Sequence, residues 1–158
     1  TYALKKANKL NVKTILNPAP AAEIDSSLFP LIDYFTPNET EASFYVDHDV
    51  VTYEDAEKAA SQLLDKGIKN VVITLGEKGA YFANSEEKFS LPIANLSNPV
   101  VDTTGAGDAF NAGLAAALTE GQNIKDSLIF ASATAGLSTT KIGTANSMPS
   151  REEIDRIL

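Results

Sequence analysis

A small glycine turn leads into an apolar helix in the stretch Asp102-Thr103-Thr104-Gly105-Ala106-Gly107-Asp108-Ala109-Phe110. The first turn of a helix has backbone N–H groups without partners and the positive end of the helix dipole, and glycines there let an anion approach the backbone. Asp108 places a carboxylate inside this anion site, where it would repel a bound phosphate. An acid in that position suggests a proton acceptor, so the stretch predicts phosphoryl transfer to a hydroxyl group.

The amino-acid composition argues against several classes of function. The 158 residues carry a net charge of -8 and are 44% hydrophobic, which fits an ordinary globular domain and disfavours binding to nucleic acid or anionic membrane. The chain has no cysteine, and His48 is its only histidine, so zinc sites and a Ser/His/Asp triad are disfavoured. Any metal ion would be a hard cation on oxygen ligands, such as Mg²⁺ or K⁺.

The ends and the apolar runs of the chain suggest its context. No apolar run approaches the length of a membrane span and no signal peptide is visible, so we expect a cytoplasmic protein with no membrane partner. The chain begins without Met, and residues 1–10 already have the pattern of the end of a helix. We therefore expect a piece of a larger protein.

Hydrophobic periodicity and turn residues predict alternating strands and helices. Because strands alternate with helices, we expect a layered α/β fold with a mostly parallel sheet and ligands at the carboxyl ends of the strands. The expected strands are 12–16, 32–36, 71–75, 80–83, 88–91 and a short one ending at 100–101, with 80–83 and 88–91 forming a hairpin around Asn84-Ser85. The expected helices are 1–10, 38–44, 52–66 with Gly67 as its stop, 105–119, 124–140 and 150–158, the last of which begins with a capping box of Ser150 and Glu153.

Two further turns follow strands and are expected at the same edge of the sheet. Residues 36–42, Thr-Pro-Asn-Glu-Thr-Glu-Ala, lead into a helix, and taken alone they are explained by Asn38 as an N-cap with acids behind it. Residues 74–79, Thr-Leu-Gly-Glu-Lys-Gly, are explained alone by a tight turn into a hairpin. The three turns together are more specific than any one of them.

With these three turns, the chain resembles the ribokinase/PfkB family of carbohydrate and nucleoside kinases. Residues 102–110 look like the C-terminal signature of the family, and residues 17–21 and 36–42 look like its ribokinase branch. The resemblance implies a three-layer, Rossmann-like (ribokinase-like) α/β fold with a mostly parallel sheet. It spans essentially the whole chain, which would be the C-terminal, nucleotide-binding portion of such a kinase, without the N-terminal half and the lid.

The resemblance also implies roles for individual residues. Asp108 matches the catalytic base that contacts the sugar, and Gly105, Ala106 and Gly107 match the anion hole. Asn38 matches a nucleotide phosphate contact, and Glu41 matches the acid that positions Mg²⁺ through water. The nucleotide is further expected along Thr74, Leu75, Gly76, Glu77, Lys78 and Gly79, with Gly107 and Asp108 at its phosphates and Ser132 at its adenosine end.

A monovalent cation site is a further implication. Kinases of the ribokinase branch bind K⁺ beside the anion hole, largely through backbone carbonyls. The positions that match this site are Asp102, Thr104, Ser138, Lys141, Gly143 and Ser147. A cation there would brace the loop that forms the anion hole.

The implied reaction is transfer of the γ-phosphate of ATP to the 5-hydroxyl of D-ribose, with Mg²⁺ required and K⁺ activating. Another PfkB sugar kinase, such as a fructokinase, and a non-catalytic nucleotide-binding module are the alternatives. Because the missing half would carry most sugar contacts and the lid, we expect little activity from the 158 residues alone. The parent protein is expected to form a homodimer through that lid.

Overall fold

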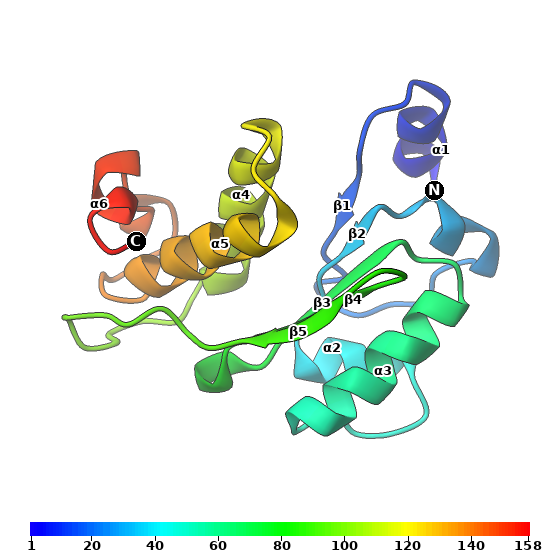
Figure 1. Cartoon of the computed structure of the whole chain (residues 1–158), viewed down its shortest axis with the longest axis horizontal. Helices are drawn as coiled ribbons and strands as arrows, with labels where there is room; N and C mark the ends of the chain where they lie inside the picture. The colour runs from blue at the N-terminus through cyan, green and yellow to red at the C-terminus, as the bar shows by residue number, and fades with distance from the viewer. The chain divides into compact units, whose positions relative to one another are not determined.

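The computed structural model describes residues 1–158 and divides into two compact units, Thr1–Ser90 and Leu91–Leu158 (Figure 1). No helix is both long enough and apolar enough to cross a membrane.

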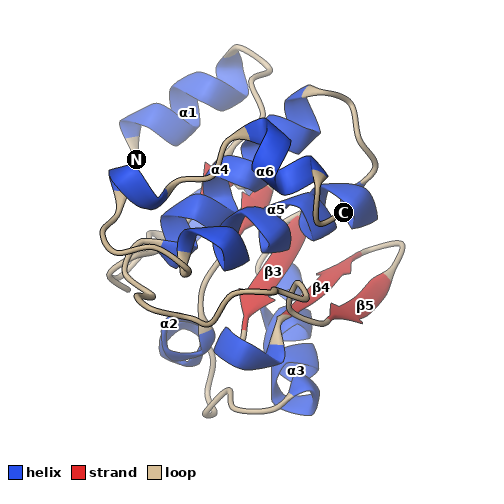
Figure 2. Cartoon of the chain, turned by 90° about the vertical axis from the view of Figure 1, so that its left-hand side faces the viewer, coloured by secondary structure: helices blue, strands red, loops and turns tan.

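A mixed five-stranded sheet organises the first unit, in the order β1-β2-β3-β4-β5 (Figure 1), and its strands are drawn in red in Figure 2. Strand β1 pairs with β2 and β2 with β3 in parallel, whereas β3 pairs with β4 antiparallel. Strand β5 extends one residue into the second unit. The elements are α1 (Tyr2–Lys9), β1 (Ile15–Leu16), the 3₁₀ helix η1 (Ser26–Leu31), β2 (Tyr34–Phe35), α2 (Glu39–Tyr45), α3 (Tyr53–Asp65), β3 (Asn70–Thr74), the 3₁₀ helix η2 (Gly76–Lys78), β4 (Ala80–Asn84) and β5 (Lys88–Leu91).

The core of the first unit lies between this sheet and helices α2 and α3, which both lie on one side of β3 (Figure 1). Val71 and Ile73 of β3 belong to that core, and Val72, which alternates with them, is also fully buried. This is the burial expected of a continuous apolar strand covered on both faces. Helix α3 ends as predicted, since Gly67 follows it with a φ of +98°.

The first two strands are shorter than the predicted 12–16 and 32–36. Their early residues are joined by side chains instead of a backbone ladder. The amide N–H of Thr14 donates to Oδ2 of Asp33 at 2.9 Å, and the N–H of Asp33 donates to Oγ1 of Thr14 at 3.0 Å. Regular pairing starts only beyond this pair, at Ile15 and Tyr34.

The second unit consists of helices and the loops that connect them. Its elements are α4 (Ala106–Thr119), α5 (Ile124–Ser138), the 3₁₀ helix η3 (Ala145–Ser147) and α6 (Arg151–Asp155). The strand predicted to end at residues 100–101 is absent, and this prediction was wrong. The N–H groups of Val101 and Asp102 both donate to the carbonyl of Thr139, at the end of α5, at 2.8 and 3.1 Å. Helix α6 is also shorter than the predicted 150–158, although its predicted capping box, Ser150 with Glu153, is confirmed.

Helices α4 and α5 pack closely because small residues face each other. A Cβ atom added at Gly113 of α4 would lie 2.7 Å from Oγ1 of Thr134 and 3.0 Å from the Cα of Ala131 on α5. Real Cβ atoms do not approach other atoms this closely, so only glycine fits here.

We expect Gly113→Ala to destabilise the second unit by about 1–3 kcal/mol, the usual cost of overpacking a well-filled core. Alanine is the better helix former, so a loss of stability would come from the contact with α5 and not from helix propensity. Thermal unfolding measures the effect. Gly107→Ala in the same helix is the matched control, because a Cβ there meets nothing within 4 Å. Equal melting temperatures for the two variants would contradict the prediction.

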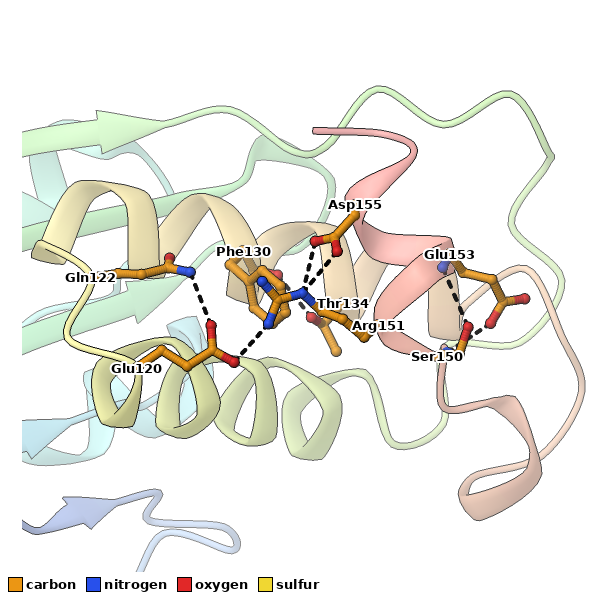
Figure 3. A network of polar contacts seen from close by, with 8 residues as sticks. All are labelled: Glu120, Gln122, Phe130, Thr134, Ser150, Arg151, Glu153 and Asp155. Carbon is orange, nitrogen blue, oxygen red and sulfur yellow. Dashed lines mark hydrogen bonds and ion pairs between the residues drawn. The ribbon is translucent and has the colours of Figure 1, made fainter.

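Arg151 connects α6 with the C-terminal end of α4 and with α5 (Figure 3). Its guanidinium donates to Glu120 just after α4 at 2.6 Å and to Asp155 of α6 at 2.8 and 3.0 Å. The same group lies over the ring of Phe130 of α5, 5.0 Å from the ring centroid. A planar guanidinium can make these contacts at once, whereas lysine cannot.

Candidate active site

Helix α4 begins differently from helices α2, α3 and α6. Its N-cap is Gly105, with a φ of +80°, and no side chain caps it. The N–H of Ala106 donates to the carbonyl of Thr103 at 3.1 Å, while the structure gives no protein acceptor for the N–H groups of Gly107 and Asp108. Helices α2, α3 and α6, in contrast, all have complete capping boxes. The start of α4 therefore offers free N–H donors to an anion.

Space and charge at this helix start fit the predicted chemistry. Gly107 and Asp108 are exposed, and a Cβ atom built on Gly107 would point into open space. Asp108 supplies the only acid of the first turn. An exposed carboxylate beside unpaired amides can contact both a bound phosphate and the group that attacks it.

Asp102 ties the loop before α4 to the loop after α5. Its Oδ1 accepts from the N–H of Thr104 at 2.9 Å, and its Oδ2 accepts from the N–H of Gly143 at 3.0 Å. These hydrogen bonds, led by that from Gly143, lower the pKa of Asp102 from 3.8 to about 2. Thr144, in the loop after α5, also packs against the glycine turn: a Cβ atom added at Gly105 would lie 3.2 Å from the Cγ2 of Thr144.

This pKa shift predicts how stability depends on pH. The native pKa lies below the unfolded one, so the contribution of Asp102 is complete above pH 4 and is lost as the pH falls through about 2. We expect the stability of wild type to fall through that window more than the stability of Asp102→Asn, which cannot titrate there. Thermal unfolding of both proteins between pH 6 and pH 2 measures this. Parallel curves would contradict the prediction. The comparison with the variant is needed because the pKa of Glu153, which pairs with Lys141, is also lowered to about 2.

The other residues predicted for the monovalent cation lie around the same loop, with their side chains engaged elsewhere. The hydroxyls of Ser138 and Ser147 are buried and donate to backbone carbonyls in their own turns, at 2.7 and 2.6 Å. The ammonium of Lys141 donates to Glu153 of α6 at 2.8 Å. Only Asp102 presents a charged oxygen, so a cation here would depend mainly on backbone carbonyls. Ser132, predicted at the adenosine end of the nucleotide, is half-buried on α5.

In the first unit, Asn38 and Glu41 form the capping box of α2. Oδ1 of Asn38 accepts from the N–H of Glu41 at 2.8 Å, and Oε2 of Glu41 accepts from the N–H of Asn38 at 2.9 Å. The N-cap interpretation of Asn38 is therefore confirmed. Glu41 is 8% exposed, and the capping box uses its Oε2, which leaves Oε1 as the other carboxylate oxygen. This oxygen fits the role of an acceptor for a water molecule on a hydrated Mg²⁺.

The second predicted nucleotide turn lies next to Asn38. Thr74 forms a parallel β-bridge with Asn38, and its N–H donates to the carbonyl of Pro37 at 3.0 Å. The turn itself is η2, with Leu75 buried before it and glycines at both ends, Gly76 and Gly79, at φ +54° and +102°. Glu77 and Lys78 are exposed on the turn. The turns at 36–42 and 74–79 are thus adjacent, as predicted.

Three residues at these sites were missed by the sequence analysis. Thr139 accepts the amides before the glycine turn, Thr144 covers Gly105, and Tyr53 contacts the carbonyl of Lys78. None belongs to a motif, and each acts on a segment more than 20 residues away. No signal in a single sequence could have found them.

Comparison with known proteins assigns the family. Residues 1–151 match the model of the pfkB family carbohydrate kinases. The chain is 42% identical to a ribokinase of Haemophilus influenzae over 151 residues, covering 96% of the chain and 49% of the relative. It is 35% identical to a deoxyribokinase of Salmonella typhi, covering 99% of the chain and 51% of the relative. The chain therefore spans about half the length of these relatives.

Solved structures agree with this assignment. A ribokinase from Thermotoga maritima matches 98% of the chain with a TM-score of 0.86 at 40% identity, over 52% of its own length. A ribokinase from Arabidopsis thaliana, complexed with ribose and ATP, matches 98% of the chain with a TM-score of 0.90 at 34% identity, over 50% of its own length. The expected ribokinase-like α/β fold is confirmed, and the chain belongs to the pfkB family of carbohydrate kinases.

Proposed function

We propose that this chain is the nucleotide-binding and phosphoryl-transfer portion of a ribokinase, which transfers the γ-phosphate of ATP to the 5-hydroxyl of D-ribose and releases D-ribose 5-phosphate and ADP. The observation that carries the proposal is the start of α4, where unpaired amides and the exposed Asp108 lie together. The ribokinase relatives, one of them in complex with ribose and ATP, support the choice of sugar and nucleotide.

Asp108 is proposed as the general base. The 5-hydroxyl oxygen attacks the γ-phosphorus, the bond to the β–γ bridging oxygen breaks, and ADP leaves. The hydroxyl proton goes to the carboxylate of Asp108, which makes the attacking oxygen a better nucleophile. No other acid lies in the first turn of α4.

The amides at the start of α4 are proposed to stabilise the charge that develops on the transferred phosphoryl group. The family resemblance implies this role for Gly105, Ala106 and Gly107. Because the N–H of Ala106 is already bound to Thr103, the contribution falls on Gly107 and on the amide of Asp108. Gly105 enters the proposal through its turn geometry, since its positive φ directs the chain into the helix.

The first unit is proposed to hold the nucleotide and its Mg²⁺. Asn38 would contact the phosphates through its side-chain amide, because its Oδ1 already caps α2. Oε1 of Glu41 would accept a hydrogen bond from a water on Mg²⁺, and the turn at 74–79 would run beside the nucleotide. When bound, Mg²⁺ neutralises the charge of the phosphates.

The loop around Asp102 is proposed as the K⁺ site. Asp102 already holds the loops before α4 and after α5 together through Thr104 and Gly143. The cation would neutralise its carboxylate and stiffen the anion hole. Dimerisation of the whole kinase through a lid outside this chain belongs to the same proposal.

The experiment that tests the sugar assignment is a phosphotransfer assay with several acceptors. The enzyme is the chain joined to the half of Haemophilus influenzae ribokinase that it does not match, supplied with ATP, Mg²⁺ and K⁺. We expect D-ribose to have the highest kcat/KM. A preference for 2-deoxyribose would favour the deoxyribokinase relatives, and a preference for fructose would favour a fructokinase. Nucleotide binding without transfer to any sugar would point to a non-catalytic module.

A further inference from the structure

Lys78 lies on the predicted nucleotide turn and makes two hydrogen bonds to residues at the start of α3. Its ammonium donates to the carbonyl of Val51 at 2.9 Å, and its own carbonyl accepts from the hydroxyl of Tyr53. The ammonium is therefore directed at the protein backbone. In this arrangement Lys78 anchors the turn, which the family resemblance places beside the nucleotide.

Tyr53 is well placed to act as the fixed partner in this contact. Its ring is half-buried and packs against the core of the first unit. The start of α3 is set by the capping box of Thr52 and Asp55, in which Oδ2 of Asp55 accepts from the N–H of Thr52 at 3.0 Å. The hydroxyl of Tyr53 thus reaches Lys78 from a rigid helix end.

The turn between β3 and β4 is tight but exposed. Inside it, the N–H of Leu75 donates to the carbonyl of Gly79 at 2.8 Å, and the N–H of Lys78 donates to the carbonyl of Leu75 at 3.0 Å. These bonds fix the shape of the turn. They do not fix its direction, because both belong to the turn and its glycine ends are conformationally permissive.

We infer that Tyr53 is a positioning residue for the nucleotide site: its hydroxyl, together with the ammonium of Lys78, holds the turn at 76–79 against the start of α3 in the conformation that receives ATP. This inference rests on the proposed function. A turn held in its binding conformation pays no ordering cost when the ligand arrives, so loss of the hydroxyl weakens nucleotide binding without unfolding the chain.

Tyr53→Phe tests this because it removes the hydroxyl and keeps the packed ring. We expect the Kd of the chain for MgADP, measured by isothermal titration calorimetry, to rise about fivefold, which corresponds to the loss of one hydrogen bond. Hydrogen exchange of the amides at 76–79 should become faster, while the melting temperature stays close to that of wild type. The matched control is Tyr2→Phe, since Tyr2 is 76% exposed and lies on α1.

A double variant adds a second readout. If the contacts of Tyr53 and Lys78 hold the turn together, their effects are coupled. Lys78→Met then weakens MgADP binding less in the Tyr53→Phe background than in wild type. An unchanged Kd and unchanged exchange in Tyr53→Phe would overturn the inference, as would a large fall in melting temperature with no change in Kd. Wild-type chain that is folded but binds no MgADP would instead overturn the proposed function on which the inference rests.

Discussion

Replacing Asp108 by asparagine is expected to lower the rate of phosphoryl transfer by about 10²–10⁴-fold, the usual contribution of a general base. Asparagine has nearly the same shape and cannot accept the hydroxyl proton. Binding of ATP should be retained or become tighter, because the change removes a negative charge from the first turn of α4, where the phosphates are proposed to lie. Slower transfer with unimpaired binding distinguishes a base from a residue that merely holds the nucleotide.

Two proteins are needed to measure both effects. The kcat is measured with D-ribose on the chain joined to the unmatched half of the Haemophilus influenzae ribokinase, and the Kd for ATP is measured on the chain itself. Asp126→Asn is the matched control, because Asp126 is likewise the acid of the first turn of α5. A kcat for Asp108→Asn within threefold of the control would contradict the role of Asp108.

Gly107→Ala is expected to reduce phosphoryl transfer by about 10²–10³-fold, the effect of losing one donor of an oxyanion site. The methyl group would project into the open space beside Gly107, where the phosphoryl group is proposed to approach the amides. ATP affinity should fall as well, because the phosphates of bound ATP are proposed to lie against the same surface.

The fold is expected to tolerate this change. Gly107 does not have a positive φ, and its Cβ would meet nothing within 4 Å. Alanine also favours helix over glycine, so the melting temperature should not decrease. Thermal unfolding and the kinetic assay are therefore read together. A variant with wild-type transfer and wild-type ATP affinity would show that the start of α4 is not the anion site.

Local patterns predicted most of the elements correctly. Helix α3 has an N-cap, an apolar face and a glycine stop within 16 residues. Each of these signals depends only on residues that are close together in the sequence. The same holds for the capping boxes at Asn38 and Ser150. The turn of the predicted hairpin is also set by nearby residues, since Oδ1 of Asn84 accepts from the amides of Glu86 and Glu87, both at 2.8 Å.

The errors arose where partners far apart in the sequence replace a local signal. Val100 and Val101 are β-branched and favour a strand, but the amide of Val101 donates to Thr139, at the end of a helix. Thr14 and Asp33 shorten two strands through side-chain hydrogen bonds across 19 residues. Periodicity describes neither kind of contact, because it reports only which residues share a face.

The candidate site shows the same division. The glycine turn and Asp108 were evident from the residues, since a helix start that binds anions needs glycine and free amides. The engagement of Lys78 with Val51 and of Ala106 with Thr103 could not be deduced, because donors of the same type serve equally well for a ligand or for the backbone.

The central claim is that this chain is the nucleotide-binding portion of a ribokinase. The most direct test is isothermal titration calorimetry, in which ATP is added to the purified 158-residue chain with Mg²⁺ and K⁺ present. We predict one ATP per chain, with affinity lowered in Gly107→Ala and retained in Asp108→Asn. A chain that unfolds cooperatively on heating, and is therefore folded, yet takes up no ATP would contradict the proposed nucleotide-binding function.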